Sequence, residues 1–228
     1  MTCNLLILRP IDGALQTERR AKDLGLTAMV DPLFKVESIA WSCPAAENFD
    51  ALLLTSANAL RYGGAQLVDY LSLPVLAVGE KTAAKAEKTG FRVVKTGAAG
   101  ARELLGELEL EPYRSILWLA GEQHAELMVE GRHLETVPVY RSRAIPLGEQ
   151  ASASLADETA ILLHSARAAR HFVSELDRLQ LPKSKHHVLA FSKNVAEAAG
   201  QGWKSVQTAR HPDDDALLFM ASALCRSR

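Results

Sequence analysis

The sequence contains few cysteines and no motif built from them. Its three cysteines are Cys3, Cys43 and Cys225, and no two form a C-x-x-C pair, which argues against a thioredoxin-like redox site or a cysteine-rich zinc site. Widely spaced cysteines in odd number are typical of buried or free thiols in a cytoplasmic protein. We therefore expect no disulfide and a cytoplasmic location.

The sequence also lacks membrane and nucleic-acid signals. It has no apolar run of membrane-spanning length and no signal peptide. Lysine and arginine number 26 and aspartate and glutamate 27, so no excess of positive charge points to a nucleic-acid partner. We expect neither a membrane nor a nucleic acid as a partner.

Motifs for metal, nucleotide and nucleophile chemistry are missing too. The seven histidines show no metal-ligand spacing such as H-E-x-x-H. The Walker pattern, G-x-G-x-x-G and the G-x-S-x-G nucleophile elbow are absent. We expect no metal and no bound nucleotide, which leaves a holder of small molecules with few strongly reactive groups.

The most informative pattern present is an internal repeat. Residues 52–60 read LLLTSANAL and residues 161–169 read ILLHSARAA, and a second strand and helix follow each, at 75–91 and 188–203. Each copy predicts strand, hydroxyl-bearing turn, helix, strand, small polar turn and Ala-rich helix. Two such α/β lobes leave a cleft that suits a sizeable small molecule.

Two strands with strict alternation, 34–39 and 137–143, bracket one of these lobes, and we expect them to run side by side as a connector. The predicted bounds are 1–33 with 144–228 for a discontinuous first domain, 46–134 for the second, and 34–45 with 135–143 for a two-stranded linker. Further predictions are helices over 57–70, 124–131 and 166–179, a polar linker over 146–154, and an N-terminal cap at Asp213.

Hydroxyl-bearing turns follow the buried strands of both copies. Thr55, Ser56 and Ser165 come directly after a strand and before a helix, at the carboxyl end of a parallel sheet where ligands bind. Free amides of a helix start beside a serine suit a carboxylate or phosphate. The same geometry also describes a plain N-terminal cap, so both interpretations stay open.

The turn after the second strand differs between the copies. In the first copy, Gly79 permits close approach of a ligand to the backbone, with Lys81 beside it, and Thr82 lies in the first helical turn. The second copy has Ser192-Lys193-Asn194-Val195 there, so the two lobes are not functionally identical.

Tyr140 lies in the second alternating strand, where strict alternation puts Pro138 and Ser142 on its face. It either points into the space between the lobes, where a phenol is able to donate a proton to a leaving group, or packs against one lobe as a surface tyrosine.

An ordered set of short motifs resembles the uroporphyrinogen-III synthase family along most of the chain. It comprises Arg9-Pro10 after the first strand, Leu54-Thr55-Ser56-Ala57-Asn58-Ala59, Val78-Gly79-Glu80-Lys81-Thr82-Ala83, Val139-Tyr140-Arg141, Ser165 and Ala209-Arg210-His211-Pro212. The sequence departs from the family pattern at Ser192 and Val195, where Gly and Thr are common, and at Ala166, where Pro is common.

The resemblance implies two flavodoxin-like α/β domains, each with a parallel sheet in three layers, joined by a two-stranded linker. It also implies cyclisation of hydroxymethylbilane to uroporphyrinogen III, with inversion of the last ring and no cofactor. We expect a monomer, with transient contact with hydroxymethylbilane synthase. The expected general acid is Tyr140, and the expected substrate-binding residues are Thr82, Ser56, Ser165, Arg9, Lys81, Gly79, Thr55, Arg141, Arg167 and Asn194. The alternative is a non-catalytic two-lobed binding or sensor module for an anionic small molecule, which the repeat and the hydroxyl turns fit equally well.

Overall fold

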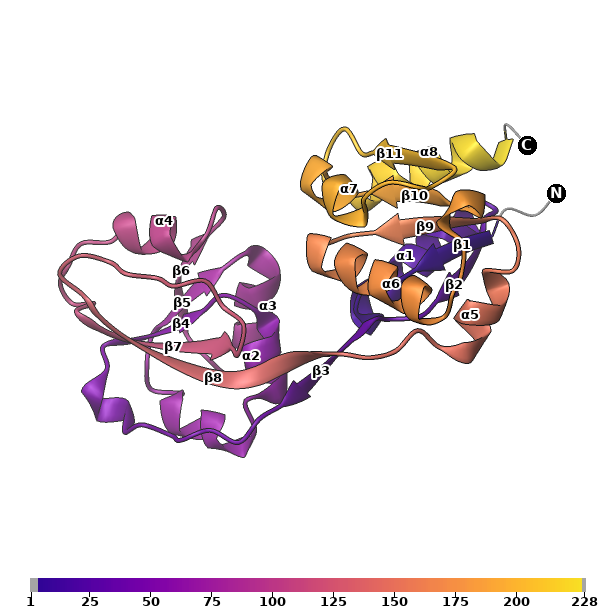
Figure 1. Ribbon diagram of the computed structural model, residues 1–228. Helices are drawn as coiled ribbons and strands as arrows, with labels where there is room; N and C mark the ends of the chain where they lie inside the picture. The colour runs from indigo at the N-terminus through magenta and orange to yellow at the C-terminus, as the bar shows by residue number, and fades with distance from the viewer. Residues whose placement is uncertain (1–3, 227–228) are drawn as a thin grey trace. The chain divides into compact units, whose positions relative to one another are not determined.

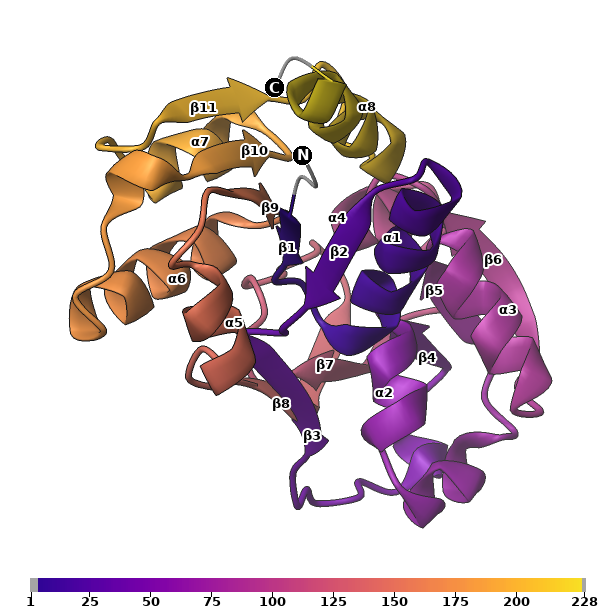
Figure 2. The ribbon, with the colours of Figure 1, turned by 90° about the vertical axis from the view of Figure 1, so that its right-hand side faces the viewer.

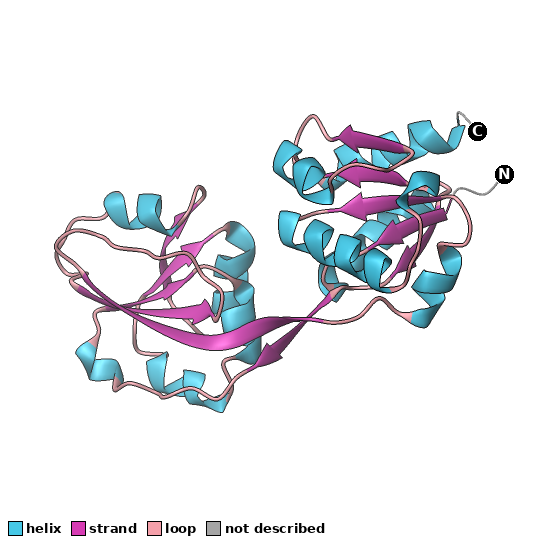
Figure 3. Cartoon of the chain, viewed as in Figure 1, coloured by secondary structure: helices cyan, strands magenta, loops and turns pink. Residues whose placement is uncertain are grey.

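The computed structural model describes residues 4–226, and these form two compact α/β units (Figures 1 and 3). Unit 1 contains the chain up to Lys35 and from Ala144 onward, and unit 2 contains Val36–Arg143. The chain therefore leaves unit 1, builds unit 2, and returns to complete unit 1.

Unit 1 is a parallel sheet of five strands in the order β11-β10-β9-β1-β2. Helices α5, α6 and α7 pack on one face of this sheet, and α1 and α8 on the other (Figure 2). Its elements are β1 Asn4–Ile7, α1 Ile11–Asp23, β2 Thr27–Val30, α5 Glu149–Ser154, β9 Thr159–Leu163, α6 Ala166–Arg178, the 3-10 turn Lys183–Lys185, β10 His187–Ala190, α7 Lys193–Ala199, β11 Ser205–Thr208 and α8 Asp214–Arg226.

Unit 2 holds a sheet of six strands in the order β3-β8-β7-β4-β5-β6. Strands β8, β7, β4, β5 and β6 are parallel, α2 and α3 pack on one face, and α4 on the other. Its elements are β3 Phe34–Ser38, the 3-10 turn Ala46–Asn48, β4 Ala51–Leu54, α2 Ala57–Tyr62, the 3-10 helix Ala65–Tyr70, β5 Val75–Val78, α3 Glu80–Lys88, β6 Val93–Gly97, α4 Ala101–Gly106, β7 Ser115–Gly121 and β8 His133–Ala144. Strand β3 begins, and strand β8 ends, within unit 1, to which Phe34, Lys35 and Ala144 belong.

The two sheets share one spatial plan with different connectivity. The sequence repeat matches β4 to β9 and β5 to β10, and the two orders then read β11-β10-β9-β1-β2 and β6-β5-β4-β7-β8. Strands β7 and β8 occupy the positions of β1 and β2, but they follow the repeat in the chain instead of preceding it. Unit 2 is therefore a circular permutation of unit 1, and the predicted fold class is confirmed.

The two alternating strands lie side by side, as predicted. The Ile39 amide donates to the Val139 carbonyl at 3.3 Å, and Arg141 Nε donates to Glu37 Oε1 at 2.8 Å. Residue numbers rise along one strand as they fall along the other, which makes this pair antiparallel.

Three predicted elements differ from the structure. The predicted linker over 146–154 contains helix α5, which Leu147, Ala151 and Leu155 anchor in the core; their spacing of four is the helical signal that the polar composition concealed. The helix predicted over 57–70 is interrupted at Gly63-Gly64, where Gly64 has a φ of +83°.

The helix predicted over 124–131 does not form. The connection from β7 to β8 must return along a strand of seven residues, roughly 23 Å at about 3.3 Å per residue. Residues 122–132 as a helix would cover only about 16 Å, so an extended path is required. Arg132 fixes the end of this path by donating to the backbone carbonyls of Leu105, Leu108, Glu109, Leu110 and Tyr113.

Two smaller predictions have opposite outcomes. Asp213 caps the last helix, because its Oδ1 accepts from the Ala216 amide at 2.7 Å. The expectation of free thiols is wrong for Cys225, which is disulfide-bonded, whereas Cys43 is free and exposed; Cys3 lies outside the described residues. Between residues 4 and 226, no helix combines the length and apolar character needed to cross a membrane.

Candidate functional site

The carboxyl edge of each sheet has one point where the strand order reverses. Such switch points are where open α/β sheets bind ligands. In unit 1 the point lies between β1 and β9, and in unit 2 between β7 and β4. The residues predicted for the site come from both units, so each edge is described in turn.

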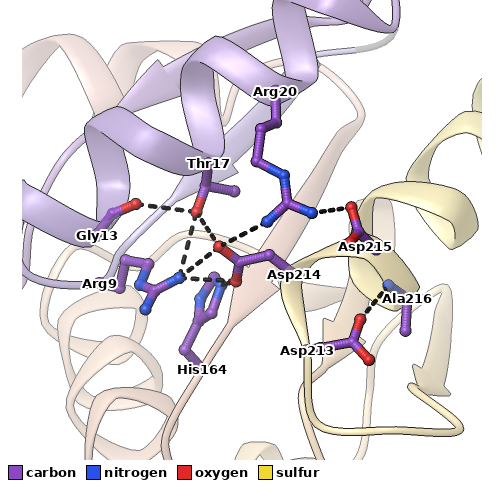
Figure 4. A network of polar contacts seen from close by, with 9 residues as sticks. All are labelled: Arg9, Gly13, Thr17, Arg20, His164, Asp213, Asp214, Asp215 and Ala216. Carbon is purple, nitrogen blue, oxygen red and sulfur yellow. Dashed lines mark hydrogen bonds and ion pairs between the residues drawn. The ribbon is translucent and has the colours of Figure 1, made fainter. Parts of the chain in front are cut away.

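A network of charged side chains occupies the edge of unit 1 (Figure 4). Arg9 Nη1, just after β1, contacts Asp214 Oδ1 at 2.7 Å and Oδ2 at 2.8 Å. The Thr17 hydroxyl donates to Asp214 Oδ2 at 2.9 Å, and His164 Nε2 lies 3.1 Å from Oδ1. Arg20 adds ion pairs with Asp214, at 3.8 Å, and with Asp215. Arg9 is therefore held by the protein's own carboxylate.

Two pKa values in this network depart from their usual range. Bonds from His164 and Thr17 and the charge of Arg9 lower the pKa of the Asp214 carboxyl against an opposing effect of burial. Burial lowers the pKa of the His164 ring, despite its contact with Asp214. At neutral pH the network therefore contains an ionised Asp214 and a neutral His164, which donates from Nε2.

The remaining predicted residues of unit 1 have ordinary local roles. The Ser165 hydroxyl caps helix α6 by accepting from the Ala168 amide at 3.1 Å. The guanidinium of Arg167 lies 4.2 Å from the centre of the Phe34 ring. Asn194 is exposed in the first turn of α7, and Val195 is buried in the core.

The edge of unit 2 has a different chemistry, because hydroxyl and aromatic groups replace the ion pairs. Thr55 Oγ1 accepts from the indole Nε1 of Trp118 at 3.1 Å. The Ser56 hydroxyl caps helix α2 by accepting from the Asn58 amide at 3.2 Å. The cap interpretation therefore holds for Ser56 and Ser165, and each cap occupies one amide of the first helical turn, that of Asn58 or Ala168.

The neighbouring turn begins helix α3. Gly79 has a φ of +84° and its amide donates to the Gly97 carbonyl at 2.8 Å. A Cβ at Gly79 would meet nothing within 4 Å, so its backbone is open to approach. Lys81 is exposed, whereas Thr82 is 5% exposed.

Tyr140 lies on a different face from the one that alternation predicts. Ala120 pairs with Pro138, but Gly121 pairs with Tyr140, so Val139 is an extra residue in β8. This β-bulge turns Tyr140 onto the face of α2 and α3, where it packs on the same apolar cluster as Val139. The expectation that it shares a face with Pro138 is therefore wrong, whereas the alternation from Tyr140 to Ser142 lies beyond the bulge and is unbroken. Its ring centre lies 6.5 Å from that of Tyr62 in α2.

Arg141, the next residue, is exposed and paired with Glu37 Oε1 at 2.8 Å. Three of the four predicted basic residues thus have partners: Arg9, Arg141 and Arg167. A substrate carboxylate would have to share or displace those partners.

The sequence prediction missed several residues that shape these edges, namely Thr17, His164, Asp214, Gly121 and Tyr62. Only the first of three consecutive aspartates, Asp213, was singled out from the sequence, as a helix cap; Asp215 is exposed, whereas Asp214 binds Arg9. The available signal was Arg9 directly after a buried strand, since an arginine in such a place needs a carboxylate partner. Within residues 4–226 no three His, Cys, Asp or Glu side chains are grouped to hold a metal ion.

The fold and these two edges define a class: two-unit α/β proteins whose parallel sheets present polar residues at their carboxyl edges. A solved structure of uroporphyrinogen-III synthetase from Helicobacter pylori is similar, with a TM-score of 0.64 and 17% identity over 98% of this chain and 100% of that one. A mutant uroporphyrinogen III synthase from Thermus thermophilus gives 0.54 and 17%, over 99% and 100%. No curated protein matches the chain.

The family model described as uroporphyrinogen-III synthase HemD matches residues 16–218. The chain therefore belongs to the uroporphyrinogen-III synthase family, and it is an enzyme of porphyrin biosynthesis.

Proposed function

We propose that the substrate is hydroxymethylbilane, a linear tetrapyrrole with eight carboxylates, and that the enzyme closes it to uroporphyrinogen III. The hydroxyl of the terminal hydroxymethyl group leaves as water, assisted by the pyrrole nitrogen, and a cationic azafulvene remains. The substituted carbon of the last ring attacks this cation and forms a spiro intermediate. Fragmentation and reclosure then invert the last ring, and loss of a proton restores the pyrrole. The family match over residues 16–218 carries this proposal.

Orientation is the main contribution required of the protein. The bilane also cyclises unaided, without inversion, so the enzyme must decide which carbon meets the cation. The small and neutral groups at the edge of unit 2 suit this task. We assign the proton donor for the departing hydroxyl to Tyr140, directly or through a water, because a phenol at a sheet edge is able to donate without introducing a fixed charge.

Carboxylate binding is assigned to the hydroxyl turns. Thr55, Ser56 and Ser165 stand at helix starts, where a carboxylate would compete with the capping serines for the amides of Asn58 and Ala168. Gly79 opens the backbone beside Thr82. Lys81 is the exposed cation of this set, and Asn194 offers an amide in unit 1. Arg9, Arg141 and Arg167 contribute positive charge that is already partly compensated by their partners.

We further propose a cytoplasmic monomer with transient contact with hydroxymethylbilane synthase, and we retain the domain bounds predicted from the sequence. The unaided cyclisation of the bilane, which occurs without inversion, motivates the contact, because short transit between the two enzymes limits this side reaction. Sedimentation of the purified protein, alone and with that synthase, tests both statements; a stable dimer would refute the first.

The decisive experiment is a coupled assay. Porphobilinogen and its deaminase generate the bilane, this protein is added, and the oxidised uroporphyrin isomers are separated by chromatography. We expect mainly isomer III. Isomer I at the level seen without enzyme would refute the assignment and favour a binding module that holds an anionic small molecule without converting it.

A further inference from the structure

The ring of Tyr140 lies directly against the backbone at the end of strand β7. A Cβ built on Gly121 would stand 2.8 Å from Tyr140 Cε2, 2.9 Å from Cζ and 3.1 Å from the phenol oxygen. Contacts under 3.0 Å do not occur between unstrained carbon atoms. The ring therefore occupies the space that a side chain at residue 121 would fill.

The backbone of Gly121 gives no other reason for a glycine. It is not among the glycines with positive φ, so an alanine is compatible with its backbone conformation. The three heavy atoms nearest to a Cβ at residue 121 all belong to the Tyr140 side chain.

Two further contacts fix the same phenol. The Glu122 amide donates to the Tyr140 carbonyl at 2.8 Å and holds the bulged segment of β8 beside the end of β7. The ring of Tyr62 lies 6.5 Å away, centre to centre, with an angle of 37° between the ring planes. The bulge selects the face, and the missing Cβ sets how closely the ring approaches the sheet edge.

We propose that Gly121 is a positioning residue for Tyr140, which keeps the phenol over the switch point between β7 and β4. This inference rests on the proton-donor role proposed for Tyr140. A methyl group on residue 121 has to push the ring from 2.8 Å to an ordinary contact of about 3.5–4.0 Å. A displacement on the order of 1 Å is enough to reduce turnover by about 100-fold when the displaced group takes part in the reaction.

The test compares four proteins in the coupled assay: wild type, Gly121→Ala, Tyr140→Phe and the double variant. We expect kcat to fall by about 10-fold to 100-fold in Gly121→Ala. The double variant should match Tyr140→Phe within about 2-fold, because no phenol remains to be misplaced. Gly106→Ala is the matched control, since a Cβ there meets nothing within 4 Å in the same unit, and it should retain the wild-type rate.

The outcomes separate this inference from the proposal beneath it. If Tyr140→Phe is slow and Gly121→Ala keeps the full rate, the positioning role is wrong and the proton-donor role stands. If the losses multiply in the double variant, Gly121 acts independently of the phenol and the inference is also overturned. If Tyr140→Phe keeps the full rate, the proton-donor role fails first, and the positioning role in the reaction fails with it.

A variant that does not fold is still informative. If Gly121→Ala unfolds because of the ring, then Gly121→Ala combined with Tyr140→Ala removes the clash and should recover the melting temperature of Tyr140→Ala alone. Persistent unfolding of that double variant would show that another neighbour excludes the methyl group, and it would overturn the inference.

Discussion

The two switch points occupy equivalent places in the two sheets but use opposite chemistry. At the edge of unit 1, Asp214 and Asp215 balance the charges of Arg9 and Arg20, and the neutral His164 contacts Asp214. At the equivalent edge of unit 2, β7 ends in Gly121 and the nearby groups are the hydroxyls of Thr55 and Ser56 and the phenol of Tyr140.

The two units have kept the same order of strands, but the residues at their sheet edges have diverged. The strand order is imposed by the packing of helices on both faces, and it is the same in both units. The edge residues do not set the strand order, so one copy carries a structural ion-pair network and the other a compact edge of hydroxyl and aromatic groups. We expect stability to depend mainly on the first edge and catalysis mainly on the second.

The largest expected effect is on turnover at the edge of unit 2. Tyr140→Phe should lower kcat by roughly 100-fold, the lower end of the usual contribution of a general acid, and should change the melting temperature little because the ring and its packing remain. The coupled isomer assay measures kcat and calorimetry measures the melting temperature. Tyr62→Phe, on the neighbouring ring, is the matched control, and an equal loss there would contradict a specific role for Tyr140.

The second effect is on stability at the edge of unit 1. Asp214→Ala leaves Arg9 and His164 without their acceptor, and we expect it to lower the free energy of unfolding by roughly 2–3 kcal/mol, below the value for a fully buried pair because Arg9 is 28% exposed. For a chain of this length the melting temperature should fall by roughly 5–10 °C.

Asp215→Ala provides the control within the same helix turn. The Asp215 side chain is 84% exposed, so its ion pair with Arg20 should contribute about 0–1 kcal/mol. Equal destabilisation by the two substitutions would mean that the network around Asp214 is no more than a surface ion pair.

The sequence predicts features that depend on neighbouring residues, and it fails for contacts between residues that lie far apart in the chain. The buried strands of each repeat copy and the Asp213 cap rest on residues within a few positions of one another, and they were predicted correctly. Asp214 and Arg9 are 205 positions apart in the sequence, and no local pattern indicates that a triple-aspartate segment reaches that arginine.

The sequence also failed to predict the sheet face on which Tyr140 lies. Alternation assigns faces only while the register is unbroken, and the bulge at Val139 shifts the register by one residue. The sequences of β7 and β8 contain no motif that indicates the bulge, because the extra residue is a valine buried in the core. Likewise, the missing helix over 124–131 follows from the distance that the connection must span, which is a property of the assembled sheet.

The third effect is a pH dependence of stability that belongs to unit 1. Burial lowers the pKa values of His164 and His186 below 6.5, so the unfolded chain binds protons there that the folded chain does not. Stability should therefore be highest above pH 7 and fall as the pH drops below 6.5, by up to about 1.4 kcal/mol per pH unit for each histidine. The Asp214 carboxyl, with its lowered pKa, stays ionised here, and its contribution is lost only under far more acidic conditions.

Urea denaturation at pH 7.5 and 5.5 measures this slope. His186→Leu should flatten it, because both ring nitrogens of the buried His186 lack a hydrogen-bond partner and the ring cannot charge without loss of stability. His124 and His133 in unit 2 are exposed, so hydrogen exchange at the lower pH should accelerate in unit 1 first. Faster exchange in unit 2 would contradict this assignment.

The smallest expected effect is a change in KM at a position where the two copies of the repeat carry different residues. Thr82 and Val195 both lie buried in the first turn of their helices, but only Thr82 carries a hydroxyl. Thr82→Val keeps the shape and removes that group, so KM should rise by roughly 3-fold to 10-fold, the value of one neutral hydrogen bond, while kcat changes little. The reciprocal Val195→Thr places a hydroxyl in an apolar core, so it should lower the free energy of unfolding by about 1–3 kcal/mol and leave KM unchanged. An unchanged KM in Thr82→Val would remove Thr82 from the site, and the two copies would then differ at this position only in packing.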